Sequence, residues 1–148
     1  MVTARTIKFV FCSLLLLIAG CDAADQLQPL TKNAVILAFG DSLTRGTGTN
    51  VEQAYPARLQ AMLSQTVINA GVPGEISKNG LMRLSGLLKQ HQPELLILCH
   101  GGNDILRKKN LKQTRENLQQ MIDLAKSNNT QVVLIGIPQF GLFLSPAP

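Results

Sequence analysis

The chain alternates between short apolar runs and longer segments with helical spacing of apolar residues. Four short runs predict strands: residues 34–39, 66–69, 94–99 and 131–135. The first run is continuously apolar, and the third is apolar after Glu94. Three segments between them predict helices: residues 52–63, 76–90 and 111–127. The side chains expected to face the sheet are Leu81, Leu84, Leu87 and Leu88 in the second helix and Leu118, Met121, Ile122 and Ala125 in the third. Alternating strands and helices predict an α/β fold, with one parallel sheet covered by helices on both faces.

The first 20 residues have the pattern of a secretory leader. Arg5 and Lys8 precede an apolar run over residues 9–18, about half the length that a membrane-spanning helix needs. The ending Ile18-Ala19-Gly20-Cys21 resembles a bacterial lipobox, so we expect cleavage before Cys21 and attachment of lipid to it. An ordinary signal peptide that is cut elsewhere nearby is the alternative.

Cleavage at this point predicts a simple layout for the mature chain. Residues 21–33 would be a polar tether that joins the lipidated Cys21 to a folded domain over residues 34–148. The lipid would anchor the protein to a membrane on the periplasmic side of a bacterial cell envelope. Cys12 would leave with the leader, so no disulfide could form within the mature chain, and we expect Cys99 to be a small buried core residue.

Composition and charge exclude several classes of partner and cofactor. The 148 residues are 45% hydrophobic and only 4% aromatic, without Trp, so there is no stacking platform for single-stranded nucleic acid. The formal net charge of +5 is too small to indicate a nucleic-acid partner, since the leader supplies part of it. The glycines form neither GxxxxGKS/T nor GxGxxG, and no cluster of residues has the spacing of metal ligands, so we expect no cofactor and no metal.

A basic segment stands at the start of the third predicted helix. Its cationic residues are Arg107, Lys108, Lys109, Lys112 and Arg115. We interpret it as a solvated face, with contact to anionic lipid as the alternative.

Unusual residues follow the first three predicted strands. Gly40-Asp41-Ser42-Leu43 follows the first, the stretch Asn-Ala-Gly-Val-Pro-Gly-Glu over 69–75 the second, and His-Gly-Gly-Asn-Asp over 100–104 the third. Because ligands bind at the carboxyl ends of parallel strands, these loops should converge. Ser42 would offer a nucleophilic hydroxyl, Gly74 a bare N–H and Asn103 an amide, which together predict a nucleophile beside an oxyanion site.

Each residue also has a plainer explanation when it is taken alone. Asp41 or Ser42 could simply be the N-cap of a short helix, since both residue types cap helices. Gly74 could belong to an ordinary Pro-Gly turn, and Asn103 could be a turn residue.

The three motifs together resemble the first three sequence blocks of the SGNH (GDSL) hydrolases, in particular the bacterial arylesterase, thioesterase I and lysophospholipase branch. The resemblance covers Val35 to about Pro148. It implies a flavodoxin-like sheet and hydrolysis of carboxylic esters or thioesters through an acyl-enzyme on Ser42. The Ser42 N–H, the Gly74 N–H and the Asn103 side chain would form the oxyanion hole. Small esters, thioesters or lysophospholipids would be the substrates of a monomer.

The family's fourth block does not occur in these 148 residues. That block is an Asp-x-x-His, whose His serves as general base and whose Asp orients it. Leu88 precedes His91 by three residues, and Ile97 precedes His100. We therefore expect an incomplete, poorly folded hydrolase domain that lacks the C-terminal strand and helix and turns over little substrate.

Two alternatives stay open at this point. His100 could substitute as the base if it lies near Ser42, although no carboxylate is obviously placed to orient it. A non-catalytic, membrane-anchored lipoprotein that keeps an ester-binding cleft is the other. Four apolar residues near the end of the chain could line an acyl pocket of the complete enzyme or merely continue into further structure: Phe140, Leu142, Phe143 and Leu144.

Overall fold

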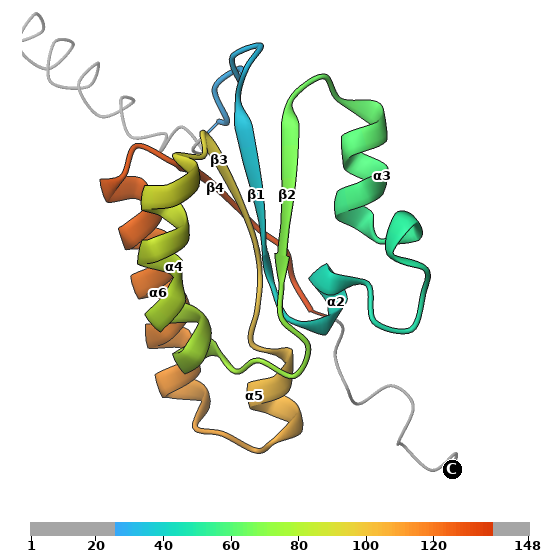
Figure 1. The fold of residues 1–148 in the computed structure, drawn as a ribbon. Helices are drawn as coiled ribbons and strands as arrows, with labels where there is room; N and C mark the ends of the chain where they lie inside the picture. Colours follow the sequence, from blue (N-terminus) through green and yellow to red (C-terminus); the bar gives the residue numbers. More distant parts are fainter. Residues whose placement is uncertain (1–25, 138–148) are drawn as a thin grey trace, which may run out of the picture.

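The computed structural model describes residues 26–137, which form a four-stranded parallel sheet (Figure 1). The strands are β1 (Val35–Gly40), β2 (Thr66–Gly71), β3 (Leu95–Cys99) and β4 (Gln131–Leu134). They lie in the order β2-β1-β3-β4, and each neighbouring pair is parallel. The apolar runs of β1 and β3 are buried on both faces, which explains their central position. The predicted α/β fold is confirmed.

Helices cover both faces of this sheet. The helices are α2 (Ser42–Arg45), α3 (Tyr55–Met62), α4 (Ser77–His91), α5 (Gly102–Leu106) and α6 (Leu111–Ser127), with a short 3₁₀ turn, η2 (Val51–Gln53), before α3. Figure 1 shows α4 and α6 side by side on one face and α3 on the other, while α2 and α5 lie at the carboxyl ends of the strands.

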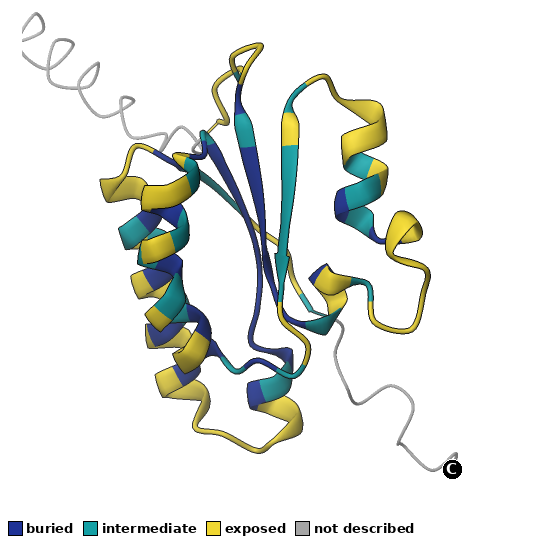
Figure 2. Ribbon diagram, in the orientation of Figure 1, coloured by how far each residue is buried: buried dark blue, intermediate teal, exposed yellow. Residues whose placement is uncertain are grey.

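The larger part of the core lies between the sheet and the pair α4 and α6. Its buried members are Leu37, Phe39, Leu84, Leu88, Leu96, Leu98, Met121 and Ala125. The four remaining side chains that were predicted to face the sheet, Leu81, Leu87, Leu118 and Ile122, are partly buried against the same cluster. A smaller cluster of Ile36, Leu95 and Ile97 lies under α3 (Figure 2). Cys99 is buried and free, as predicted.

The predicted helix over 52–63 is wrong at its start. Residues Val51–Gln53 form a 3₁₀ turn whose N-cap is Asn50, and the backbone is extended at Ala54 before α3 begins. Pro56 lies in the first turn of α3. Because proline has no backbone N–H, it is suited to a helix start and interrupts a helix that would run through it. The apparent helical spacing therefore spans two separate elements.

Several predictions concern residues outside the described part of the chain. The leader over 1–20, the lipid site Cys21 and the apolar residues Phe140, Leu142, Phe143 and Leu144 all lie there. None of the helices over residues 26–137 combines the length and the apolar character that crossing a bilayer requires.

Candidate active site

The carboxyl ends of β1, β2 and β3 bring the three predicted loops to one edge of the sheet. The chain runs from β1 to β2 on one side and then to β3 on the other, so the strand order reverses at β1. A reversal of this kind opens a crevice between the loops of the two diverging connections. The residues after β1 and β3 flank this point, and those after β2 lie next to it.

Ser42 is the first residue of α2, directly after the turn that leaves β1. Asp41 is the N-cap of this helix, because its buried carboxylate accepts a hydrogen bond of 3.0 Å from the Leu43 N–H. The plainer explanation therefore holds for Asp41. Ser42 itself is half-buried, and its side chain is not the one that caps α2.

Gly74 lies in the turn between β2 and α4, with φ of +74°. Residues other than glycine rarely adopt this left-handed backbone conformation, so the turn favours glycine at this position. Among the described residues, a Cβ at this position would meet only the Arg107 guanidinium, at 3.2 Å, and the same guanidinium donates to the Gly74 carbonyl at 2.8 Å. The space that a side chain would fill at Gly74 is therefore open, apart from the flexible side chain of Arg107. The Arg107 contact also links the basic segment to the carboxyl edge of the sheet.

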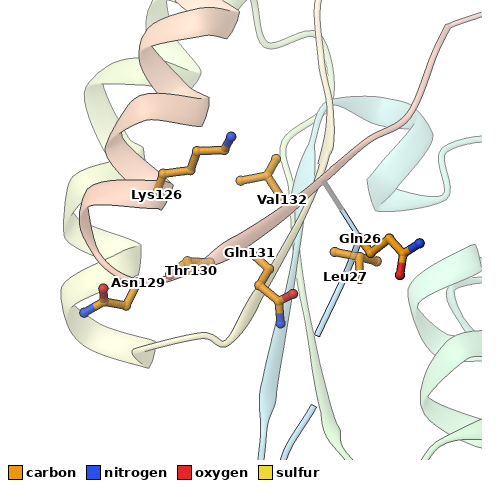
Figure 3. Close-up of a pocket in the computed structure, with 7 residues that line it drawn as sticks. All are labelled: Gln26, Leu27, Lys126, Asn129, Thr130, Gln131 and Val132. Atoms are coloured by element: carbon orange, nitrogen blue, oxygen red, sulfur yellow. The ribbon is translucent and has the colours of Figure 1, made fainter. Parts of the chain in front are cut away.

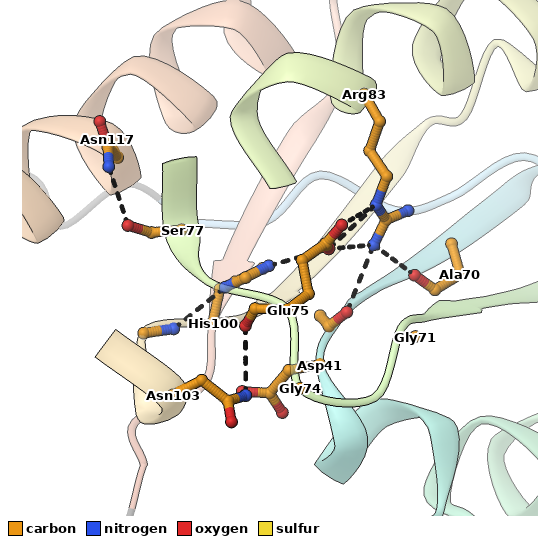
Figure 4. A network of polar contacts seen from close by, with 12 residues as sticks. Asp41, Ala70, Gly71, Gly74, Glu75, Ser77, Arg83, His100, Asn103 and Asn117 are labelled. Atoms are coloured by element: carbon orange, nitrogen blue, oxygen red, sulfur yellow. Dashed lines mark hydrogen bonds and ion pairs between the residues drawn. The ribbon is translucent and has the colours of Figure 1, made fainter. Parts of the chain in front are cut away.

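Asn103, the second residue of α5, connects the three loops. Its Nδ2 donates to the Asp41 Oδ2 at 3.0 Å and to the Glu75 carbonyl at 3.1 Å (Figure 4). These contacts place the Asn103 amide beside both the residue before Ser42 and the residue after Gly74. They also occupy the two N–H groups of the amide, so Asn103 must give up one partner before it can donate to an oxyanion.

His100 is buried, and its ring is engaged on both sides. Its Nε2 lies 3.2 Å from the Glu75 Oε2, and its Nδ1 accepts from the Gly101 N–H at 3.1 Å. Glu75 is thus a carboxylate in contact with this histidine that sequence reasoning missed. Because Nδ1 is an acceptor, the proton of the neutral ring is on Nε2, directed at Glu75, and no ring nitrogen is left to take a proton from Ser42. The geometry argues against His100 as a substitute base.

His91 is remote from the candidate site. It is the last residue of α4, whose carboxyl end leads into the amino end of β3. It therefore lies at the opposite end of the sheet from Ser42.

Asp104, the residue after Asn103, connects α5 to the helices α4 and α6. Its buried carboxylate accepts from the Ser77 N–H at 2.8 Å, the Ser77 hydroxyl at 2.7 Å and the Thr114 hydroxyl at 3.3 Å. The Ser77 hydroxyl in turn accepts from the Asn117 amide at 2.8 Å. The Asp104 carboxylate therefore links α5 to the first turns of α4 and α6. These contacts fix the position of α5, which carries Asn103.

An apolar groove opens beside β3 and β4 at the same edge. It encloses about 310 Å³, and its lining includes His100, Ile105, Leu111, Leu118, Leu134 and Ile135. These side chains are of the type that accommodates an acyl chain.

A second hollow lies at the other end of the sheet (Figure 3). It is lined by Gln26, Leu27, Lys126, Asn129, Thr130, Gln131 and Val132. None of the predicted site residues belongs to this hollow.

Comparison with known proteins gives a consistent family. The profile of the GDSL-like lipase/acylhydrolase family matches residues 38–148. The chain is 34% identical over 134 residues to esterase TesA of Pseudomonas aeruginosa, covering 85% of this chain and 67% of the relative. It is 38% identical over 104 residues to thioesterase 1/protease 1/lysophospholipase L1 of Escherichia coli K12, covering 69% of this chain and 50% of the relative.

Solved structures agree with these relatives. The SGNH-hydrolase family esterase AlinE4 superposes with a TM-score of 0.66 at 34% identity, covering 74% of this chain and 61% of the other. The crystal structure of TesA gives a TM-score of 0.69 at 34% identity, covering 74% of this chain and 65% of the other. The chain thus spans between half and two thirds of the length of these proteins. The resemblance inferred from the three motifs is confirmed, and the chain belongs to the GDSL-like lipase/acylhydrolase family.

Proposed function

We propose that the chain carries the nucleophile and the oxyanion hole of a carboxylic-ester hydrolase. The substrates of this hydrolase would be small esters, thioesters or lysophospholipids. Ser42 is the nucleophile, and the Ser42 N–H, the Gly74 N–H and the Asn103 amide are the oxyanion donors. The observation that carries this proposal is the Asn103 amide, which contacts Asp41 beside Ser42 and Glu75 beside Gly74. Relatives named esterase, arylesterase and thioesterase/lysophospholipase support the reaction class.

The reaction would proceed through an acyl-enzyme. The Ser42 oxygen attacks the ester carbonyl carbon and loses its proton, and the carbonyl oxygen becomes an oxyanion that the three donors stabilise. The bond to the leaving group then breaks, and the departing alcohol or thiol takes up a proton. Water attacks the acyl-Ser42 ester, releases the carboxylic acid and restores the hydroxyl.

The described residues supply the oxyanion donors of this reaction but offer Ser42 no free base. Both histidines of the chain are described, and neither has a ring nitrogen directed at Ser42. General-base assistance typically contributes about 10²–10⁴-fold to the rate. We therefore expect these 148 residues to acylate slowly at neutral pH.

The test uses the full chain and a p-nitrophenyl alkylphosphonate, which modifies a nucleophilic serine covalently and releases p-nitrophenol. Mass spectrometry of the digested protein should find the phosphonyl group on the peptide that contains Ser42, and Ser42→Ala should remove it. Asn103→Ala should slow the modification by about 10²–10³-fold, the usual effect of losing one oxyanion donor. Equal modification of the parent chain and Ser42→Ala would contradict the proposal.

A second candidate is a non-catalytic lipoprotein that binds esters without turnover. The observation that favours it is the engagement of both ring nitrogens of His100. The two candidates separate in a p-nitrophenyl butyrate assay. Release of p-nitrophenol that Ser42→Ala abolishes indicates an enzyme, whereas saturable binding with equal release by both proteins indicates a binding protein.

We also propose that Cys21 carries lipid and holds the protein on the periplasmic side of the envelope, with the chain itself a monomer. The lipobox-like ending before Cys21 supports this placement. Incorporation of an alkyne-labelled fatty acid in a bacterial host, lost in Cys21→Ala, would be the expected result.

A further inference from the structure

A group of ionisable side chains lies directly behind the proposed oxyanion donors and takes no part in the bond changes of the proposed reaction. Glu75 follows Gly74 in the turn before α4, Arg83 lies within α4, and His100 follows β3. The side chains of Glu75 and His100 are 7% and 0% exposed, and that of Arg83 is 26% exposed. A carboxylate that is this well buried needs partners that compensate for the loss of water, and Figure 4 shows how Arg83 and His100 meet Glu75.

Arg83 fastens Glu75 to the ends of two strands. Its Nε donates to both Glu75 carboxylate oxygens, at 2.8 and 2.9 Å, and its Nη2 lies 2.7 Å from Oε2. The same Nη2 donates to the Ala70 carbonyl of β2 at 2.8 Å and lies 3.3 Å from the Gly40 carbonyl of β1. The guanidinium also stacks on Phe39, with its Cζ 4.1 Å from the ring centroid. One planar cation therefore bridges the carboxyl ends of β1 and β2 and the turn that contains Gly74.

His100 fastens the same carboxylate to β3. Its Nε2 contacts the Glu75 Oε2, and its ring packs closely against Gly80 of α4. A Cβ at Gly80 would lie only 2.5 Å from the His100 Nε2, so the absence of a side chain makes room for the ring. Glu75 is thus held from α4 on one side and from β3 on the other.

The contacts of Glu75 extend to each proposed catalytic group. Its backbone follows Gly74 directly, and its carbonyl accepts from the Asn103 Nδ2. The Gly40 carbonyl that Arg83 reaches belongs to the residue before Asp41 and Ser42. A change at the Glu75 carboxylate would therefore move Gly74 and Asn103 relative to Ser42.

We propose that Arg83, Glu75 and His100 are positioning residues that set the relative placement of the Gly74 N–H and the Asn103 amide. This inference rests on the proposed function. A misplacement of about 1 Å in such a site can slow a reaction by about 10²-fold without unfolding the protein. The competing explanation is that the three residues only stabilise the fold.

Burial disfavours a charge on Glu75, but the hydrogen bonds from Arg83 and His100 and the positive charge of Arg83 outweigh this effect and hold the pKa of the Glu75 carboxyl below its usual range. The carboxylate is therefore ionised at neutral pH, as the paired geometry requires.

The experiment compares Glu75→Gln with Glu94→Gln in the full chain. Glu94 is the matched control, because its carboxylate accepts from the Thr31 N–H and hydroxyl at the opposite end of the sheet. Two properties are measured: the rate of Ser42 phosphonylation, and the NMR signals of the Gly74 backbone amide and the Asn103 side-chain amide. Thermal unfolding of each variant reports its effect on stability.

We expect Glu75→Gln to slow phosphonylation by about tenfold or more and to shift both amide signals. Glu94→Gln should leave the phosphonylation rate and both amide signals unchanged, even if it lowers the melting temperature as much as Glu75→Gln does. Arg83→Lys keeps the charge but cannot make the forked contact, so it should resemble Glu75→Gln.

Equal phosphonylation rates with unshifted Gly74 and Asn103 signals in Glu75→Gln would overturn the positioning role. If the parent chain is not phosphonylated at all, the proposed function fails, and the amide signals alone decide the inference. Shifts in Glu75→Gln but not in Glu94→Gln would then still support it, and their absence would reject it.

Discussion

Single residues at the carboxyl edge of the sheet depend on close backbone approach. A Cβ at Gly40 would lie 2.2 Å from the Cys99 carbonyl oxygen and 2.3 Å from the Thr44 hydroxyl. The Cys99 oxygen belongs to the backbone of the neighbouring strand, so the clash is relieved only if β1 and β3 separate. We predict that Gly40→Ala lowers the free energy of unfolding by about 1–3 kcal/mol.

The control for this prediction is Gly86→Ala in α4. Apart from the neighbouring backbone of α4 itself, no atom of the described residues lies within 4 Å of the position that a Cβ would occupy at Gly86. Alanine is favoured over glycine in a helix interior by about 0.5–1 kcal/mol, so this variant should be more stable than the parent chain. Urea unfolding followed by circular dichroism measures both variants, and a loss of stability in each would contradict the steric argument.

The charge of Glu75 makes part of the stability depend on pH. Burial opposes its ionisation, but Arg83 and His100 lower the pKa of its carboxyl from the ordinary value of 4.5. A carboxyl whose pKa is lower in the folded state stabilises the fold above its unfolded pKa and loses that effect as the pH falls through the folded pKa. The free energy of unfolding should therefore fall as the pH drops below about 4.5.

Urea titrations between neutral pH and pH 3 should show a weaker acid dependence for Glu75→Gln than for the parent chain. The residual dependence in this variant is expected to include Glu94, whose carboxyl pKa is lowered by the Thr31 hydrogen bonds. Identical pH dependence in the two proteins would show that Glu75 ionises alike when folded and unfolded.

At the scale of elements, Asp104 is the connection between α4, α5 and α6. Its carboxylate accepts from the N–H and hydroxyl of Ser77 at the start of α4 and from the Thr114 hydroxyl of α6. Asp104→Ala leaves the buried N–H and hydroxyl of Ser77 without this acceptor, and each such loss costs about 1–3 kcal/mol, whereas the Thr114 hydroxyl keeps the Asn110 carbonyl at 3.1 Å. Asp123→Ala, on the exposed face of α6, should change the stability by no more than about 0.5 kcal/mol. Similar melting temperatures for the two variants would contradict this assignment.

Elements with a sustained local pattern were predictable, and those without one were not. The continuous apolar runs of β1 and β3 and the helical periods of α4 and α6 are patterns within one segment. By contrast, α2 and α5 contain only four and five residues, too few to show a helical period.

The hydrogen-bonded pairs of the candidate site could not be predicted from the sequence either. Asn103 and Asp41 are 62 residues apart, and His100 and Glu75 are 25 apart. No spacing rule links such pairs, because only the strand order brings them together. The convergence of the loops followed from the parallel sheet, whereas the carboxylate partner of His100 required the structure.

For the molecule as a whole, the two faces of the sheet are unequally packed. Among residues 26–137, eight buried residues form the cluster between the sheet and the pair α4 and α6, and three form the cluster under α3. β2, which borders α3, is nowhere fully buried. Local stability follows the density of buried apolar contacts, so the two faces should open with different free energies.

Native-state hydrogen exchange should resolve this difference. We predict that the amides of α3 exchange through local opening, at least about tenfold faster than those of α4 and α6, while β1 and β3 exchange only on global unfolding. The proposed site lies between the two helical layers. Ser42 begins α2, which precedes α3, whereas Asn103 belongs to α5, which contacts the start of α4 through Asp104. Opening of the α3 side would therefore expose the surroundings of Ser42 while the contacts of Asp104 still hold α5 and Asn103. If the amides of α3 and α4 exchanged together at one rate, the sheet and both layers would instead unfold as a single unit.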